Sequence, residues 1–155
     1  MSSINSPTAK AESSKQYATF LIDDRLYGID VMEVQEVTQA LMPTTIRLAP
    51  DYVKGLINLR GQIVTAVGLR ELFGLPKSVD AQSHASVVCR IDGNLFSLLV
   101  DRIGDVVEVS PRDFEATPST IDNGLGKFMS GVYKTAGSIL SVLNIASIST
   151  ELNAK

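Results

Sequence analysis

The sequence predicts an all-β protein with a few short helices. Short runs of Val, Ile, Thr and aromatic residues alternate with Gly, Asp and Asn along most of the chain, a pattern typical of small barrels and sandwiches. Apolar residues make up 45% of the 155 residues and charged residues 20%, which is ordinary for a domain with its own core. A third observation, an internal repeat, predicts two similar barrels packed together.

The chain divides into a central domain and two tails. Residues 1–16 are rich in Ser, Ala and Asn and lack the apolar run of a signal peptide, so we expect a disordered N-terminal tail. The domain is expected to cover residues 17–150, followed by a C-terminal tail at 151–155. The longest apolar stretch, Leu95–Val100, is too short to span a bilayer. The single cysteine excludes an internal disulfide and favours a cytoplasmic location.

Turn-forming residues divide the first half of the domain into short elements. Asp30 is suited to begin a helix because it forms a capping box with Glu33, and the valines at positions 31, 34 and 37 then share one helix face. The predicted elements are strands at Tyr17–Asp23, Leu26–Ile29 and Thr44–Leu48, a helix over Asp30–Val37, a helical turn at Pro50–Lys54, a hairpin of Leu56–Leu59 and Gln62–Val67, and a short helix at Leu69–Phe73.

The second half shows the same kind of pattern. After a loop at Pro76–Ala85, the predicted elements are strands at Ser86–Ile91, Leu95–Val100 and Val106–Val109, a turn-rich stretch at Thr117–Gly126, a hairpin of Phe128–Thr135 and Ser138–Leu143, and a helix at Asn144–Leu152.

An internal repeat relates the two halves of the domain. A shift of 76 residues places Gly55 on Gly131 and Gly61 on Gly137, together with the apolar residues of both hairpins. We expect the first pair at sites of close backbone approach and the second pair in turns that need a positive φ. A shift of 69 residues earlier in the chain aligns Ile22, Val34 and Val37 with Ile91, Ile103 and Val106.

Few residues suggest catalysis or metal binding. His84, the only histidine, lies in a Ser/Ala-rich stretch, and Cys89 lies in an apolar run, where a thiol is usually a small core residue. Asp23-Asp24 has the composition of an ordinary turn, and Gly124–Lys127 lacks the glycine spacing of a phosphate loop. We therefore expect no enzyme activity, no cofactor and no metal. The 14 basic residues are scattered, which argues against a nucleic-acid ligand.

Two segments carry a family signature. Gly28–Val37 reads G-I-D-V-M-E-V-Q-E-V, and Val53–Val64 contains a K-G-x-x-N-L-R-G hairpin. At this spacing the two segments resemble the CheW family, and the resemblance extends from about Tyr17 to Ile148. Thr65 and Gly68 depart from the family, which usually has Pro and Asp there. The missing Asp leaves the following helix without a local cap.

The resemblance implies both a fold and a function. The fold would be two intertwined five-stranded barrels of SH3-like type around a shared core, in agreement with the internal repeat. The function would be that of a non-catalytic chemotaxis adaptor, coupling the cytoplasmic tip of transmembrane chemoreceptors to the regulatory domain of the histidine kinase CheA. Such a protein is cytoplasmic, is recruited to receptor arrays without entering the membrane, and is monomeric in isolation. Two alternatives stay open: an adaptor of a pili-linked or other non-flagellar pathway, and a small ligand-binding barrel.

Most candidate binding residues are apolar. By the resemblance, a receptor helix lies in a groove between the barrels, and for each candidate wall residue the alternative is a place in the core. Gly55 and Asn58 belong to the hairpin motif and complete the set. The candidate wall residues are Val34, Val37, Leu56, Val88, Leu99 and Val100.

Arg60 and Glu36 are the charged candidates. Arg60 is expected at a hairpin tip, where Asn, Asp or Gly suits the turn better, and arginine is enriched at interface hot spots. We therefore predict that Arg60→Ala leaves folding unchanged to within about 0.5 kcal/mol but weakens partner binding. Glu36 has apolar neighbours and is expected at a surface edge. For both residues a solvated surface charge is the alternative.

Overall fold

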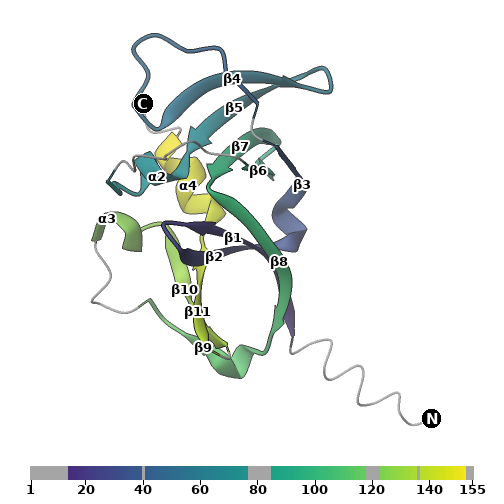
Figure 1. The fold of residues 1–155 in the computed structure, drawn as a ribbon, viewed down its shortest axis with the longest axis vertical. Coiled ribbons are helices and arrows are strands. Elements are labelled where there is room, and N and C mark those ends of the chain that lie inside the picture. The colour runs from purple at the N-terminus through teal and green to yellow at the C-terminus, as the bar shows by residue number, and fades with distance from the viewer. Residues whose placement is uncertain (1–13, 40, 77–84, 118–122, 136, 153–155) are drawn as a thin grey trace, which may run out of the picture.

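The chain folds into two β-sheets with a few short helices. A computed structural model describes residues 14–39, 41–76, 85–117, 123–135 and 137–152. In Figure 1 the second sheet lies above the first, and the helices α2 (Leu69–Leu72) and α4 (Ile145–Leu152) lie between them. Most of the expected N-terminal tail, His84, most of the loop expected at Pro76–Ala85 and residues 118–122 lie outside the described residues.

The first sheet has six strands in the order β8-β1-β2-β11-β10-β9, and the second has five in the order β3-β6-β7-β5-β4. Because β9 has only two residues, each sheet has five main strands, as expected. The strands of the first sheet are β1 (Lys15–Ile22), β2 (Arg25–Asp30), β8 (Arg102–Val109), β9 (Phe114–Glu115), β10 (Met129–Thr135) and β11 (Ser138–Leu143). Those of the second are β3 (Val34–Gln39), β4 (Val53–Leu59), β5 (Gln62–Gly68), β6 (Ala85–Ile91) and β7 (Asn94–Val100).

The structure confirms the internal repeat and adds an exchange of strands. The 69-residue shift carries β1, β2 and β3 onto β6, β7 and β8, and the 76-residue shift carries β4 and β5 onto β10 and β11. Pairing nevertheless crosses between the halves, since β3 pairs with β6 and β8 with β1. The parallel registers also repeat: Ala66 lies opposite Ser97 in one sheet, and Val142 opposite Gly28 in the other. Each barrel therefore combines strands from both halves of the chain.

Among the hairpin turns whose central residues are both described, three have positive φ at both positions, the geometry that matches strand twist. The turn residues are Asp23 and Asp24 at +55° and +63°, Arg60 and Gly61 at +55° and +86°, and Asp92 and Gly93 at +52° and +84°. Gly137, which the repeat matches to Gly61, has a φ of +80°. The expectation for the two repeat-related turn glycines is thus confirmed.

Gly55 and Gly131 lie where two backbones meet, as the repeat predicted. A β-carbon on Gly55, whose φ is +138°, would come within 2.1 Å of the Thr44 carbonyl oxygen. A β-carbon on Gly131 would come within 2.3 Å of the Phe114 ring and 2.6 Å of the Glu115 carbonyl oxygen. Each glycine therefore lets a neighbouring segment lie directly against its hairpin.

The expected helix over Asp30–Val37 is wrong. Only the 3₁₀ turn η2 (Val31–Glu33) forms, and the chain then continues as β3. Asp30 does act as a cap, because its Oδ1 accepts a hydrogen bond of 2.9 Å from the Met32 N–H. The β-branched valines that matched a helix face also favour a strand, and pairing with β6 decides between the two.

Other expected boundaries also change. The strand expected at Thr44–Leu48 is reduced to a single bridge between Thr44 and Leu56, and Leu48 has a φ of +65° that interrupts an extended chain. The helical turn expected at Pro50–Lys54 is a plain turn leading into β4. The first strand begins at Lys15, before the expected Tyr17, whereas α4 ends at Leu152, as expected.

Two small cores fill the barrels, and a larger one joins them. The joining core takes residues from both sheets and from α2, α3 (Asn123–Gly126) and α4. A path of aromatic rings, Phe20, Tyr27, Phe73 and Phe128, crosses this core with centroid distances of 5.6 to 5.9 Å. The expected shared core is therefore present.

Gly68 occupies the N-cap position of α2 and makes no side-chain cap, as its departure from the family pattern predicted. A β-carbon there would come within 2.3 Å of Glu71 Oε1. That carboxylate forms a 2.8 Å ion pair with Lys54. The absence of a side chain at Gly68 thus leaves space for a link between α2 and β4.

Candidate functional site

Glu36 and Arg60 form one exposed corner of the second barrel. Arg60 Nη2 lies 2.8 Å from Glu36 Oε1, and Arg60 Nε lies 3.3 Å from Glu36 Oε2, so the contact has two points. The Arg60 hydrogen bond holds the pKa of Glu36 below its ordinary value. Because β3 and the β4–β5 hairpin lie at opposite edges of the sheet, this ion pair also helps to close the barrel.

The guanidinium remains largely available to a partner. The Arg60 side chain is 76% exposed, whereas that of Glu36 is 20% exposed. Glu36 thus positions Arg60 while the face of Arg60 stays open. We call this pair the charged corner.

Two other motif residues shape the hairpin. Asn58 Oδ1 accepts a 2.9 Å hydrogen bond from the Gly61 N–H, which fixes the turn that carries Arg60. Gly55 is buried and accommodates Thr44, as described above. Leu56, between them, is 36% exposed. Among these three, Leu56 is the residue that presents an apolar side chain to solvent.

The two candidate valines of β3 differ in exposure. Val37 is 44% exposed, whereas Val34 is half-buried and packs against the joining core. A register shift between Val34 and Glu36 turns the strand between these positions. Val37 is therefore accessible to a partner, and Val34 is chiefly a packing residue.

Three apolar candidates are core residues, and their assignment to a groove wall is corrected. Val88 and Leu99 fill the second barrel at 0% and 8% exposure, and Val100 lies in the joining core at 1%. The reason is that β6 and β7 are interior strands covered on both faces. An apolar strand of this kind cannot be distinguished from a groove wall by its sequence.

Sequence reasoning did not select two exposed apolar residues of β8. Ile103 and Val106 are 38% and 59% exposed, and the internal repeat matches them to Val34 and Val37. β8 also contacts β6, the partner of β3, so both edge strands border the junction between the sheets. Figure 1 shows β3 and β8 on the same side of the molecule. We call Val37, Ile103 and Val106 the edge-strand residues.

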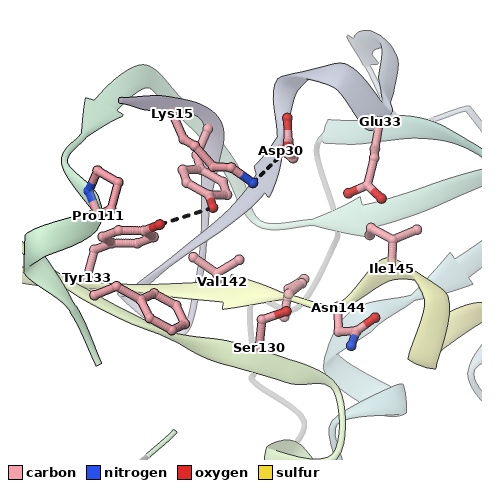
Figure 2. Close-up of a pocket in the computed structure, with 12 residues that line it drawn as sticks. Lys15, Asp30, Glu33, Pro111, Ser130, Tyr133, Val142, Asn144 and Ile145 are labelled. Carbon is pink, nitrogen blue, oxygen red and sulfur yellow. Dashed lines mark hydrogen bonds and ion pairs between the residues drawn. The ribbon is translucent and has the colours of Figure 1, made fainter. Parts of the chain in front are cut away.

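A pocket of about 540 Å³ opens at one end of the first barrel. Figure 2 shows aromatic rings at one end of it and the Glu33 carboxylate at the other. Its lining comes from β1, β2, η2, β10, β11 and the start of α4, with Pro111 of the 3₁₀ turn η3 (Pro111–Asp113) and Phe114 at the rim. None of the predicted site residues lines this pocket.

Within the described parts of the chain, no group of three His, Cys, Asp or Glu residues is placed to hold a metal ion. Burial raises the pKa of the Cys89 thiol to about 12, so the thiol stays protonated near neutral pH. Among the described helices, none is long and apolar enough to cross a membrane.

These features define a class of protein. Duplicated, strand-exchanged barrels hold a charged corner and exposed apolar edge strands on a rigid frame, which is the construction of a module that binds other proteins. The model of the CheW-like domain family matches residues 16–153, nearly the whole described chain. The chain belongs to this family.

Individual relatives agree with the family match. The chain is 31% identical to the chemotaxis protein CheW of Treponema pallidum over 90% of its own length and 84% of that protein. It is 29% identical to the CheW of Thermotoga maritima, over 94% and 95% of the two chains. The crystal structure of the scaffolding protein TtCheW from Thermoanaerobacter tengcongensis superimposes with a TM-score of 0.75 and 29% identity, covering 84% of this chain and 88% of that one. The chain is therefore a chemotaxis coupling adaptor of the CheW type.

Proposed function

We propose that this adaptor acts without catalysis by binding the regulatory domain of a CheA-type histidine kinase and the cytoplasmic tip of chemoreceptors, and that these contacts recruit it to receptor arrays. The observation that carries the proposal is the charged corner. Arg60 is 76% exposed on a turn whose φ of +55° suits Asn or Gly better than Arg.

The edge-strand residues supply the apolar part of the proposed surface. Val37, Ile103 and Val106 are between 38% and 59% exposed and come from strands that border the junction between the barrels. A receptor tip is helical, and an amphipathic helix binds by placing its apolar face against such a surface. The neighbouring charged corner would then add directional hydrogen bonds, which set orientation more than affinity.

The test is titration calorimetry of the purified chain against the CheA regulatory domain and against a receptor cytoplasmic fragment, both from its own genome. We expect Arg60→Ala to weaken at least one of these complexes about tenfold or more, since truncating a hot-spot residue costs about 2 kcal/mol or more and about 1.4 kcal/mol corresponds to tenfold in affinity. The free energy of unfolding obtained from melting curves should stay within about 0.5 kcal/mol of that of the natural chain, as for other surface substitutions.

Arg102→Ala is the matched control, because Arg102 is 67% exposed and its nearest carboxylate, Asp24, is 93% exposed at 3.5 Å. Its affinities should equal those of the natural chain. If Arg60→Ala binds both partners as well as Arg102→Ala does, the charged corner is not part of the binding surface.

A further inference from the structure

The pocket in the first barrel has an aromatic wall that none of the preceding function uses. The Tyr17 and Tyr133 rings lie 5.5 Å apart, and Phe114 meets Tyr133 edge-on at 5.1 Å. The two tyrosine hydroxyls lie 3.5 Å from each other, and a dashed line marks this contact at Tyr133 in Figure 2. Aromatic faces carry partial negative charge and attract cations within about 6 Å of the ring centre.

The opposite wall carries a carboxylate without a partner. No described residue forms an ion pair or hydrogen bond with Glu33, whereas the neighbouring Asp30 is paired with Lys15 at 3.7 Å and caps the Met32 N–H. Burial, and secondarily the charge of Asp30, raise the pKa of Glu33, while Lys15 opposes this shift. Glu33 is itself exposed to solvent, and a cation beside it would add to the partial compensation that Lys15 supplies.

The floor is apolar and offers nothing to an anion. Val142, Leu143 and Ile145 line it, and these side chains suit an aliphatic stem. The first turn of α4 does not offer an open anion site, because the Asn144 side chain caps it by accepting a 3.1 Å hydrogen bond from the Ser147 N–H. The pocket thus combines aromatic, anionic and aliphatic surfaces with one cation, Lys15, which is paired with Asp30 at 3.7 Å.

We propose that this pocket binds an organic cation with an aliphatic stem, a guanidinium or alkylammonium group held between Glu33 and the aromatic wall. Its volume of about 540 Å³ is of the size of small-molecule sites and accommodates a side chain the length of arginine or lysine. An arginine stem would lie along the floor, as long basic side chains do on apolar surfaces.

The test is an NMR titration of the isotopically labelled chain with N-acetyl-arginine amide, beside its neutral isostere N-acetyl-citrulline amide. We expect saturable shifts around Tyr17, Glu33 and Asn144 for the arginine compound, and at least about tenfold weaker binding of citrulline, since charge-assisted contacts are about twice as strong as neutral ones. Equal binding of the two compounds, or no saturable shift with arginine, would overturn the proposal.

Two variants locate the site. Glu33→Gln should weaken arginine binding about tenfold, and Phe114→Leu should weaken it through loss of the ring while a melting curve confirms folding. Glu108→Gln, which removes an exposed carboxylate outside the pocket, should bind like the natural chain. If Glu33→Gln and Phe114→Leu both bind the arginine compound as tightly as Glu108→Gln does, the assignment to this pocket is wrong.

Agmatine distinguishes the source of the cation. Both compounds carry the guanidinium, agmatine as a free small molecule and the capped arginine as a stand-in for a protein side chain. Once the capped arginine binds saturably, the tighter of the two binders assigns the source. The titration uses the chain alone, and its outcome therefore does not depend on the adaptor function.

Discussion

Arg60 illustrates how a single residue can be chosen for something other than stability. Its φ of +55° places it in the left-handed region, which costs a residue with a β-carbon roughly 1–2 kcal/mol. The ion pair with Glu36 is exposed, and exposed pairs of this kind add little to stability, so it does not offset this cost. The backbone strain at Arg60 is thus larger than the stabilisation from its ion pair, so arginine at this position does not serve folding. This supports a role for Arg60 in binding.

Two glycines of the same hairpin allow a test of backbone constraint. Gly55→Ala should lower the free energy of unfolding by about 3 kcal/mol or more, because the alanine methyl would overlap the Thr44 carbonyl as well as strain the backbone. Gly61→Ala should cost only about 1–2 kcal/mol, since nothing lies within 4 Å of its added β-carbon. Urea unfolding of both variants measures the difference. Equal losses would show that the contact with Thr44 can yield.

Glu33 should make stability depend on pH. The pKa of Glu33 in the folded chain is raised above the ordinary 4.5. The contribution of Glu33 to the free energy of unfolding is therefore fully present below pH 4.5 and is lost as the pH rises through the folded pKa. Glu33→Gln cannot ionise and should escape this loss. The stability of the variant relative to the natural chain should therefore grow between roughly pH 4 and pH 7. Thermal melts across this range measure it, and a difference that stays constant with pH would contradict the assignment.

At the scale of elements, β3 shows how tertiary pairing overrides a local pattern. Valines at positions 31, 34 and 37 match a helix face, and Asp30 supplies a genuine cap. The same valines have high strand propensity, and β6 offers an edge with which β3 pairs. The helix ends after one 3₁₀ turn because in a strand the backbone forms hydrogen bonds with β6 and the β-branched side chains adopt the conformation that they prefer.

The strand geometry makes Val37 a better probe of binding than Val34. Val37→Asp should leave the free energy of unfolding within about 0.5 kcal/mol of that of the natural chain, since Val37 is 44% exposed. The same substitution should weaken receptor binding. Val34→Asp should instead cost about 2 kcal/mol, because Val34 packs against the joining core and its replacement brings a charge there. Urea unfolding and calorimetry of each variant separate the two effects. Full binding by a folded Val37→Asp protein would exclude the edge strand from the site.

At the scale of the molecule, strand exchange makes the two barrels depend on each other. The first barrel combines β1 and β2 of the first half with β8, β10 and β11 of the second, and the second barrel combines β3, β4 and β5 of the first half with β6 and β7 of the second. A buried arginine adds to this link: Arg70 of α2 lies 2.8 Å from Asp23, in a turn of the first sheet, and 2.8 Å from Asp101, where the chain crosses between the sheets. Arg70 also donates a 2.9 Å hydrogen bond to the Pro76 carbonyl.

Removing this arginine should weaken the whole fold. Arg70→Met should lower the free energy of unfolding by about 2–3 kcal/mol, below the usual range for a broken buried pair, because Asp23 and Asp101 are 40% and 29% exposed. Arg102→Met, at an exposed ion pair of 3.5 Å, should change it by less than about 0.5 kcal/mol. Urea unfolding compares them. Equal stability of the two variants would mean that the link between the sheets does not depend on Arg70.

Part of the candidate site was accessible from sequence and part was not. The hairpin of Arg60 was predicted because turn residues act locally, and the repeat already matched Val37 to Val106. For Val88 and Val100 the sequence left the groove wall and the core as alternatives, because a strand covered on both faces has the same composition as a groove wall. The pocket was not foreseen either, since Tyr17, Glu33 and Tyr133 come from distant parts of the chain.

By itself the sequence determined the hairpins, the positive-φ turns, the duplication and membership of the family. Each of these depends on residues a few positions apart or on similarity between segments, which one chain displays directly. Only the tertiary structure decided that β3 is a strand, that the halves exchange strands, and that Arg70 joins the sheets. Those outcomes depend on which distant segment supplies hydrogen bonds and burial, and that choice is made by packing the whole chain at once.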